Sequence, residues 1–200
     1  MASGDRRLIA VTGGSGAGKT TLARVLAAQL DATLVLQDWF LRPRPERPSP
    51  AFLEKFDFAA MERAVHQLLA GGRVRIAPFD QKTRSRTGDI TLQPRPVCIV
   101  EGVAVLYSPI VRRLASERVF LDVPAGERED RQIKRLDEEG WYVGQSRDET
   151  VAAILAKKTT EDPIILRQIR FADRIVNDPS FQVCAEPVPA VLLEWCRRFI

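Results

Sequence analysis

The chain has 200 residues, of which 45% are hydrophobic and 28% are charged, a composition typical of one packed domain. No apolar run approaches the roughly 20 residues that a membrane-spanning helix needs, so we expect no membrane association. The net charge of +4 comes from 24 Arg and 6 Lys against 26 acidic residues, but the arginines are dispersed and no nucleic-acid-binding motif accompanies them, so we expect no nucleic-acid partner.

The first expected strand, Leu8–Thr12, leads into a glycine-rich loop and then into the first expected helix, Lys19–Leu30. The loop matches the pattern G-x-x-x-x-G-K-[ST] at Gly13, Gly18, Lys19 and Thr20. In such a unit the glycines let successive backbone N–H groups point at a phosphate, and the helix N-terminus favours the anion. The sequence therefore predicts a site for a nucleoside triphosphate with Mg²⁺, and a chance glycine-rich turn is the alternative.

Two side chains of this phosphate loop, residues 13–20, have distinct expected roles. The Lys19 ammonium reaches the β- and γ-phosphate oxygens, and the Thr20 hydroxyl takes one position around Mg²⁺. The residues expected to contact the nucleotide are Gly13, Gly14, Ser15, Gly16, Ala17, Gly18, Lys19, Thr20 and Thr21.

The second expected strand, Thr33–Gln37, is followed directly by Asp38. Since ligands of parallel sheets bind at the carboxyl ends of the strands, we expect this carboxylate beside the phosphate loop. There it would orient a substrate hydroxyl for in-line attack on the γ-phosphorus, a role that depends on positioning more than on basicity. A turn or helix-cap aspartate is the alternative.

The next segments interrupt the pattern. The proline-rich stretch 41–50 is expected to be an extended loop, and Phe58–Ala70 an amphipathic helix. His66, the single histidine, falls on that helix and is expected to be structural, which excludes a three-histidine metal site. The segment Val74–Leu92 is predicted to form a β-hairpin with its turn at residues 87–89.

The expected strand Val97–Val100 ends at Glu101, which precedes Gly102. This pattern resembles a Walker B strand with Glu in place of the usual Asp, and the carboxylate would hold Mg²⁺ directly or through water. Many strands end in an acidic residue, so an ordinary strand end is the alternative.

A short helix at Ile110–Ala115 and a strand at Val119–Asp122 precede an arginine-rich helix, expected at Gly126–Asp137. Its cations are Arg128, Arg131, Lys134 and Arg135, and Arg147 stands before the next expected helix, Asp148–Lys157. On a flap that closes over the triphosphate, these arginines would neutralise charge on the transferred phosphoryl group. A solvated basic helix face is the alternative.

The last expected elements are a strand at Arg174–Val176 and a helix at Ala190–Phe199. The alternation of strands and helices predicts an α/β fold, a three-layer αβα sandwich around a mainly parallel sheet. The three cysteines lack metal-ligand spacing, and the residues before Leu8 are too few for a signal peptide. Both features favour a reduced, cytoplasmic protein.

Taken together, the motifs resemble those of the uridine kinase-like P-loop kinases, whose relatives include phosphoribulokinase and type I pantothenate kinase. The matching segments are the phosphate loop, Gln37–Phe40, Ala77–Asp80 with Ser85 and Arg86, Val100–Gly102, the arginine helix and Ser146–Asp148, between about residues 8 and 178. The resemblance implies one P-loop kinase domain over residues 1–200 with a small helical lid inserted at about residues 124–150. It implies that ATP and Mg²⁺ serve to phosphorylate a hydroxyl group of a small molecule, and a homodimer is the default for the group.

The resemblance also implies roles for single residues. Asp38 matches the family's catalytic aspartate, and Glu101 matches its magnesium-linked glutamate. The arginines that match the lid and its edge are Arg128, Arg131, Arg135 and Arg147. We expect the last three, with Lys19, to act on the transferred phosphoryl group, and Arg128 to contact the substrate.

The residues expected to bind the phosphoryl acceptor, here called the acceptor half of the site, depart from the family pattern. Phe79 replaces a tyrosine, Arg84 stands in place of a histidine, and Pro50–Leu53 lacks the carboxylate that contacts a ribose in the family. We therefore expect an acceptor other than uridine, with Arg84 contacting an anionic or carbonyl-rich group. The residues expected to wall the acceptor site beside Asp38 are Trp39, Phe40, Phe79 and Arg84.

These patterns predict an ATP- and Mg²⁺-dependent small-molecule kinase. A regulatory GTPase is excluded because the single asparagine, Asn177, is not part of an Asn-Lys-x-Asp motif. A non-catalytic or regulatory ATP-binding module is the alternative, although Lys19, Asp38 and Glu101, whose loss would mark it, are all present.

Overall fold

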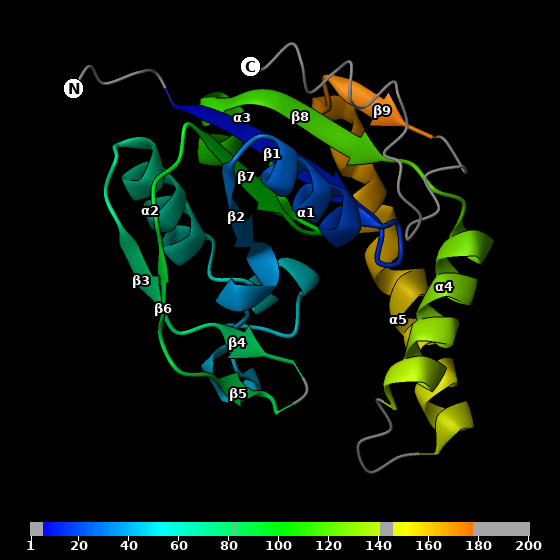
Figure 1. The fold of residues 1–200 in the computed structure, drawn as a ribbon. Helices are drawn as coiled ribbons and strands as arrows, with labels where there is room; N and C mark the ends of the chain where they lie inside the picture. The colour runs from blue at the N-terminus through cyan, green and yellow to red at the C-terminus, as the bar shows by residue number, and fades with distance from the viewer. Residues whose placement is uncertain (1–5, 82, 141–145, 178–200) are drawn as a thin grey trace.

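A computed structural model describes residues 6–81, 83–140 and 146–177. Its centre is a five-stranded sheet with the order β2-β7-β1-β8-β9, in which all neighbouring strands are parallel (Figure 1). The strands are β1 (Arg7–Gly13), β2 (Ala32–Leu36), β7 (Val97–Glu101), β8 (Ala115–Leu121) and β9 (Arg174–Val176). All five correspond to strands expected from the sequence, although β8 begins at Ala115 rather than at Val119.

Helices cover both faces of this sheet (Figure 1). The helices are α1 (Lys19–Gln29), α2 (Phe58–Leu69), α3 (Pro109–Leu114), α4 (Ala125–Glu139) and α5 (Arg147–Leu166). Of these, α1, α2 and α3 pack on the sheet, whereas α4 and much of α5 lie beside each other beyond it (Figure 1). Because side chains alternate between the faces of a strand, Ile9 and Val11 of β1 pack in one hydrophobic cluster with α1. Leu8 and Ala10 pack in a second cluster with α2 and α3. The protein is therefore a three-layer α/β sandwich, as the sequence predicts.

The hairpin predicted for Val74–Leu92 is present, but its turn lies elsewhere. Four short strands build it, β3 (Val74–Ile76), β4 (Phe79–Asp80), β5 (Ser85–Arg86) and β6 (Ile90–Leu92). Strand β3 pairs with β6 and β4 with β5, both antiparallel, so the hairpin reverses between Asp80 and Ser85 and not at 87–89. Thr87 instead donates its N–H to Pro78 O at 2.8 Å, within the irregular segment between β5 and β6.

Helix α5 is longer than the sequence predicts. It runs on through Pro163, whereas the expected helix ends at Lys157. The residues that follow Lys157 are mostly polar, which hides the helical periodicity. In the structure Lys158, Glu161 and Ile165 are buried against the rest of the protein, so tertiary packing extends the helix beyond its local pattern.

A short helical turn lies at the carboxyl end of β2. The helical turn η1 (Gln37–Phe40) follows β2 directly and shapes the edge of the sheet. Within the described residues, no helix is both long and apolar enough to cross a membrane. The helix predicted at Ala190–Phe199 lies outside the described residues.

Candidate active site

The phosphate loop connects β1 to α1 at the carboxyl edge of the sheet. Gly16 and Gly18 have φ angles of +83° and +89°, a left-handed conformation that suits glycine. Glycine conformations of this kind build the anion-binding concavities of phosphate loops. The Lys19 ammonium donates a hydrogen bond to Gly14 O at 2.9 Å, so it lies against the loop backbone.

Lys19, Asp38 and Glu101 meet at this edge. In the register of the sheet, Glu101 of β7 lies between Val11 of β1 and Leu36 of β2, and Asp38 follows two residues after Leu36. Burial lowers the pKa of Lys19 and raises the pKa values of Asp38 and Glu101. The attraction between the ammonium and the two carboxylates opposes each of these shifts. Groups that lie far apart in the sequence are thus close in space.

Thr20 and Glu101 are the residues expected to hold a metal ion. The Thr20 hydroxyl donates to Glu101 Oε1 at 2.8 Å, and Glu101 is only 5% exposed. Hydroxyl and carboxylate oxygens are the hard ligands that Mg²⁺ prefers, so the donor set fits this ion. Among the described residues, no group of three or more His, Cys, Asp or Glu side chains is arranged to hold a metal.

Asp38 lies in η1 with its side chain open to solvent. Gln81 Nε2 donates to Asp38 Oδ2 at 2.7 Å. The surrounding protein still removes part of the hydration of the carboxyl group and raises its pKa, against the opposing charges of Lys19 and Lys157. Sequence reasoning missed Gln81, from the β4–β5 turn, and Lys157, from α5. Only the true position of the hairpin turn would have pointed to Gln81.

Some of the side chains predicted to line the acceptor site lie in the hydrophobic core. Phe40 and Phe79 are 5% and 9% exposed and belong to hydrophobic clusters, so their rings offer little surface to a ligand. Trp39 is half-buried and packs against the cluster that contains Phe40. Arg84 is exposed on the β4–β5 turn, with a φ angle of +54°.

Arg128, in the first turns of α4, is a buried ion-pair residue. It is 2% exposed, and its two terminal nitrogens donate to the Asp162 carboxylate of α5 at 3.1 and 2.7 Å. Its Nε donates to Val123 O at 2.9 Å. The sequence expectation was that Arg128 contacts the substrate, whereas in the structure protein surrounds its guanidinium.

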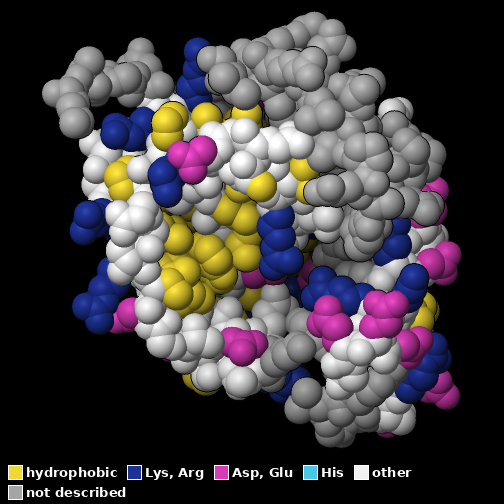
Figure 2. Space-filling model, viewed as in Figure 1, with side chains coloured by type: hydrophobic (Ala, Val, Ile, Leu, Met, Phe, Trp, Pro, Cys, Tyr) yellow, Lys and Arg dark blue, Asp and Glu magenta, His cyan; other side chains and the backbone are white. Residues whose placement is uncertain are grey.

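The other arginines of the predicted lid form ion pairs with acidic residues of α4. Figure 2 shows basic and acidic side chains mixed on the surface in this part of the molecule. The ion pairs are Arg131–Glu127 at 3.4 Å, Arg135–Glu139 at 3.3 Å and Arg147–Asp137 at 2.8 Å. Burial has the largest effect on the pKa values of Lys19 and Asp38, lowering the first and raising the second. The positive charge of Arg135 also acts on both groups and lowers both pKa values, so its field reaches the site. Residues 141–145 of the predicted lid lie outside the described residues.

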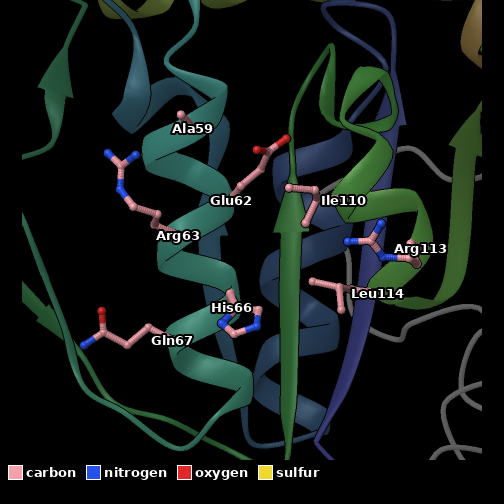
Figure 3. A pocket seen from close by; sticks show the side chains of 8 residues that line it. All are labelled: Ala59, Glu62, Arg63, His66, Gln67, Ile110, Arg113 and Leu114. Carbon is pink, nitrogen blue, oxygen red and sulfur yellow. The ribbon is translucent and has the colours of Figure 1, made fainter.

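A second concave region lies away from this edge. A groove of about 590 Å³ runs between α2 and α3, which ends where β8 begins (Figure 3). His66 lines it from α2, between Glu62 and the C-terminal end of the helix. The single histidine is therefore remote from the carboxyl ends of the strands, where ligands of such sheets bind.

Strand β1, the phosphate loop and α1 build the unit on which P-loop proteins bind nucleoside triphosphates, and the neighbouring parallel strands add acidic groups at their ends. The fold and the site together define a P-loop protein. The model of the "Phosphoribulokinase / Uridine kinase family" matches residues 50–183. The chain belongs to the phosphoribulokinase and uridine kinase family.

Individual relatives agree with this family. A uridine kinase from Brevibacillus brevis is 30% identical over 193 residues, which cover 89% of this chain and 87% of the relative. A uridine kinase from Lactobacillus helveticus is 26% identical over 203 residues, which cover 92% of this chain and 95% of the relative. Family membership supports a phosphotransferase that acts on a hydroxyl group.

Solved structures share the fold. The crystal structure of a candidate fructose transport system kinase from Silicibacter sp. TM1040 aligns with a TM-score of 0.62 and 28% identity, over 86% of this chain and 90% of that one. A possible uridine kinase from Bacillus stearothermophilus aligns with a TM-score of 0.57 and 17% identity, over 88% of this chain and 91% of that one. The second similarity is one of fold alone.

Proposed function

We propose that this chain transfers the γ-phosphoryl group of MgATP to a hydroxyl group of a small molecule. The observation that carries the proposal is the meeting of Lys19, Asp38 and Glu101 at one edge of the sheet. A protein that only binds a nucleotide does not need the Asp38 carboxylate beside Lys19. Membership of a kinase family supports the same class of reaction.

Each of these residues has a role that its surroundings permit. Lys19 and the amides of the phosphate loop bind the β- and γ-phosphates. Thr20 and Glu101 hold Mg²⁺, which supplies positive charge to the phosphate oxygens when it is bound. Asp38 accepts a hydrogen bond from the acceptor hydroxyl, orients its oxygen toward the γ-phosphorus and takes up its proton. Since its pKa is raised, Asp38 is a stronger base than an ordinary aspartate.

The lid, at about residues 124–150, is proposed to bring Arg131, Arg135 and Arg147 onto the transferred phosphoryl group. Arg135 supports this role because its charge acts on both Lys19 and Asp38. Arg147 is bonded to Asp137 through two nitrogens, at 2.8 and 3.0 Å, and would exchange this partner for a phosphate oxygen on closure.

The acceptor is proposed to be other than a pyrimidine nucleoside. Arg84 lies on the same turn as Gln81, whose amide reaches Asp38, so an acceptor held by Asp38 would lie near this turn. The named relatives differ in the compound that their names contain, uridine in one group and fructose in the other. An acceptor half that varies between family members agrees with the absence of a carboxylate from Pro50–Leu53.

The test is a coupled assay of ADP release from MgATP with uridine, cytidine, fructose, pantothenate, glycerate and ribulose 5-phosphate as acceptors. We expect one of the non-nucleoside acceptors to stimulate ADP release, and the Asp38→Asn variant to lose this stimulation. Uridine as the best acceptor would contradict the proposed acceptor class. Tight MgATP binding without turnover of any acceptor would favour a non-catalytic ATP-binding module.

A further inference from the structure

Arg128 uses all three of its side-chain nitrogens. Nε donates to Val123 O at 2.9 Å, and the two terminal nitrogens donate to Asp162 at 3.1 and 2.7 Å. One of the terminal nitrogens, Nη1, also lies 3.4 Å from Ser15 O in the phosphate loop. The planar fork of arginine suits such a site because one rigid group can bridge several partners. Arg128 therefore joins α4, α5 and the phosphate loop.

Two glycines of the phosphate loop lie close to Arg128, Gly14 against its side chain and Gly16 against its backbone. The G-x-x-x-x-G-K pattern requires Gly13 and Gly18 but leaves positions 14 and 16 open. A Cβ atom at Gly14 would lie 2.6 Å from Cζ of Arg128, and a Cβ atom at Gly16 would lie 3.1 Å from the Arg128 carbonyl carbon. Both approaches are closer than ordinary packing allows. The loop backbone and Arg128 are thus in direct contact.

Asp162 bonds to Arg128 through both of its carboxylate oxygens. Its side chain is 15% exposed, and both of its oxygens accept from Arg128. Lys158, one turn earlier on α5, is buried, and its ammonium has no hydrogen-bond partner among the described residues. Asp162 therefore bonds to Arg128 of α4 rather than to Lys158, its i−4 neighbour on the same helix.

We propose that Arg128 and Asp162 form a positioning pair, which holds the phosphate loop against α4 and α5 in the shape that binds the nucleotide phosphates. The inference rests on the proposed function because it assigns the pair a role in nucleotide binding. Arg128 acts here as a positioning residue, because its side-chain nitrogens bond to protein oxygens. Arg131 and Arg135 follow one and two turns later on α4, so the pair anchors the end of the helix from which they project.

A pair that served stability alone would behave differently. A buried ion pair that is replaced on both sides by apolar residues often leaves stability unchanged or improved. The double variant Arg128→Met with Asp162→Leu can therefore keep the fold while it removes every hydrogen bond from position 128 to the loop. If the pair positions the loop, this variant folds but binds the nucleotide poorly.

The test is calorimetric binding of MgAMP-PNP, a non-hydrolysable ATP analogue, to the full chain. We expect at least tenfold weaker binding by the double variant and by Arg128→Lys, which keeps the charge but loses the fork. Asp173→Asn is the control, since it weakens another arginine–aspartate pair, the more exposed one with Arg118 of β8, bonded at 2.8 Å, away from the loop. It should bind within twofold of the wild type.

Binding by Arg128→Lys within twofold of the wild type would overturn the positioning role. If the double variant does not fold, Arg128→Lys decides the question, with the amide NMR signals of Gly14 and Gly16 as a second readout. These signals should shift in Arg128→Lys and stay in place in Asp173→Asn, and unshifted signals would overturn the role. If the wild type itself binds no MgAMP-PNP, the proposed function is contradicted. A difference in binding between the wild type and the variants tests only the positioning role.

Discussion

The Gly14→Ala variant tests the contact between the phosphate loop and Arg128 by adding one methyl group. Gly14 is not among the glycines with a positive φ angle, so its backbone accepts alanine. The new Cβ would lie 2.6 Å from Cζ of Arg128, a side chain whose guanidinium Asp162 and Val123 O hold in place. The methyl group must therefore displace either the ion pair or the loop.

The expected cost follows from overpacking. An extra methyl group in a well-packed site costs about 1–3 kcal/mol. In a chain of this size each kcal/mol lowers the melting temperature by about 2–4 °C, so we predict a decrease of about 2–12 °C. Gly126→Ala is the matched control because it lies in the first turn of α4 with nothing within 4 Å of an added Cβ. It should be neutral, or stabilise the protein by up to about 1 kcal/mol, since alanine favours a helix.

Thermal unfolding followed by circular dichroism measures both variants. Gly14→Ala combined with Arg128→Lys should cost less than the sum of the single changes, because lysine leaves room for the methyl group. Equal melting temperatures for Gly14→Ala and Gly126→Ala, or strictly additive costs in the double variant, would show that Arg128 does not press against the loop.

Three further predictions concern the chemistry of the site, and a fourth concerns a buried thiol of the core. Asp38→Asn and Lys19→Ala should each lower kcat at least about a hundredfold, which corresponds to about 3 kcal/mol, in the ADP-release assay. Glu101→Gln should raise the Mg²⁺ concentration needed for half-maximal activity by about tenfold or more in a Mg²⁺ titration, and an unchanged requirement would remove Glu101 from the metal site. Because the pKa of Asp38 is raised and the group must be ionised to accept a proton, kcat/KM should fall as the pH decreases through that raised pKa, and a profile without an acid limb would contradict this role. Burial raises the pKa of the Cys98 thiol to about 12, so iodoacetamide should leave Cys98 unmodified in the folded protein at pH 8 and modify it after unfolding, as peptide mass spectrometry can show.

The groups at the strand ends could be predicted because their positions depend on local patterns. Asp38 and Glu101 each follow a short apolar run, and Lys19 follows a glycine-rich loop. Parallel strands then bring such ends to one edge whatever the rest of the chain does. The register that places Glu101 between Val11 and Leu36 confirms this expectation.

The surroundings of these groups depend on tertiary contacts that local patterns do not carry. Arginine spacing placed Arg128 on one helix face with Arg131 and Arg135, but its burial depends on Asp162, 34 positions later. A signal was present in Gly14 and Gly16, which the phosphate-loop pattern does not require and which indicate a close neighbour.

The hairpin turn was misplaced for a related reason. Thr87-Gly88-Asp89 has the composition of a turn, yet the pairing of Phe79 with Arg86 sets the reversal between Asp80 and Ser85. This register brings Gln81 to Asp38, a contact that a turn at 87–89 would not make.

ADP release from MgATP by the wild type and by Asp38→Asn, with and without each acceptor of the panel, decides whether the strand-end groups form a kinase active site. We predict that an acceptor stimulates release by the wild type, that Asp38→Asn is at least about a hundredfold slower, and that both bind MgAMP-PNP equally well. Release by Asp38→Asn as fast as by the wild type would contradict the proposed mechanism.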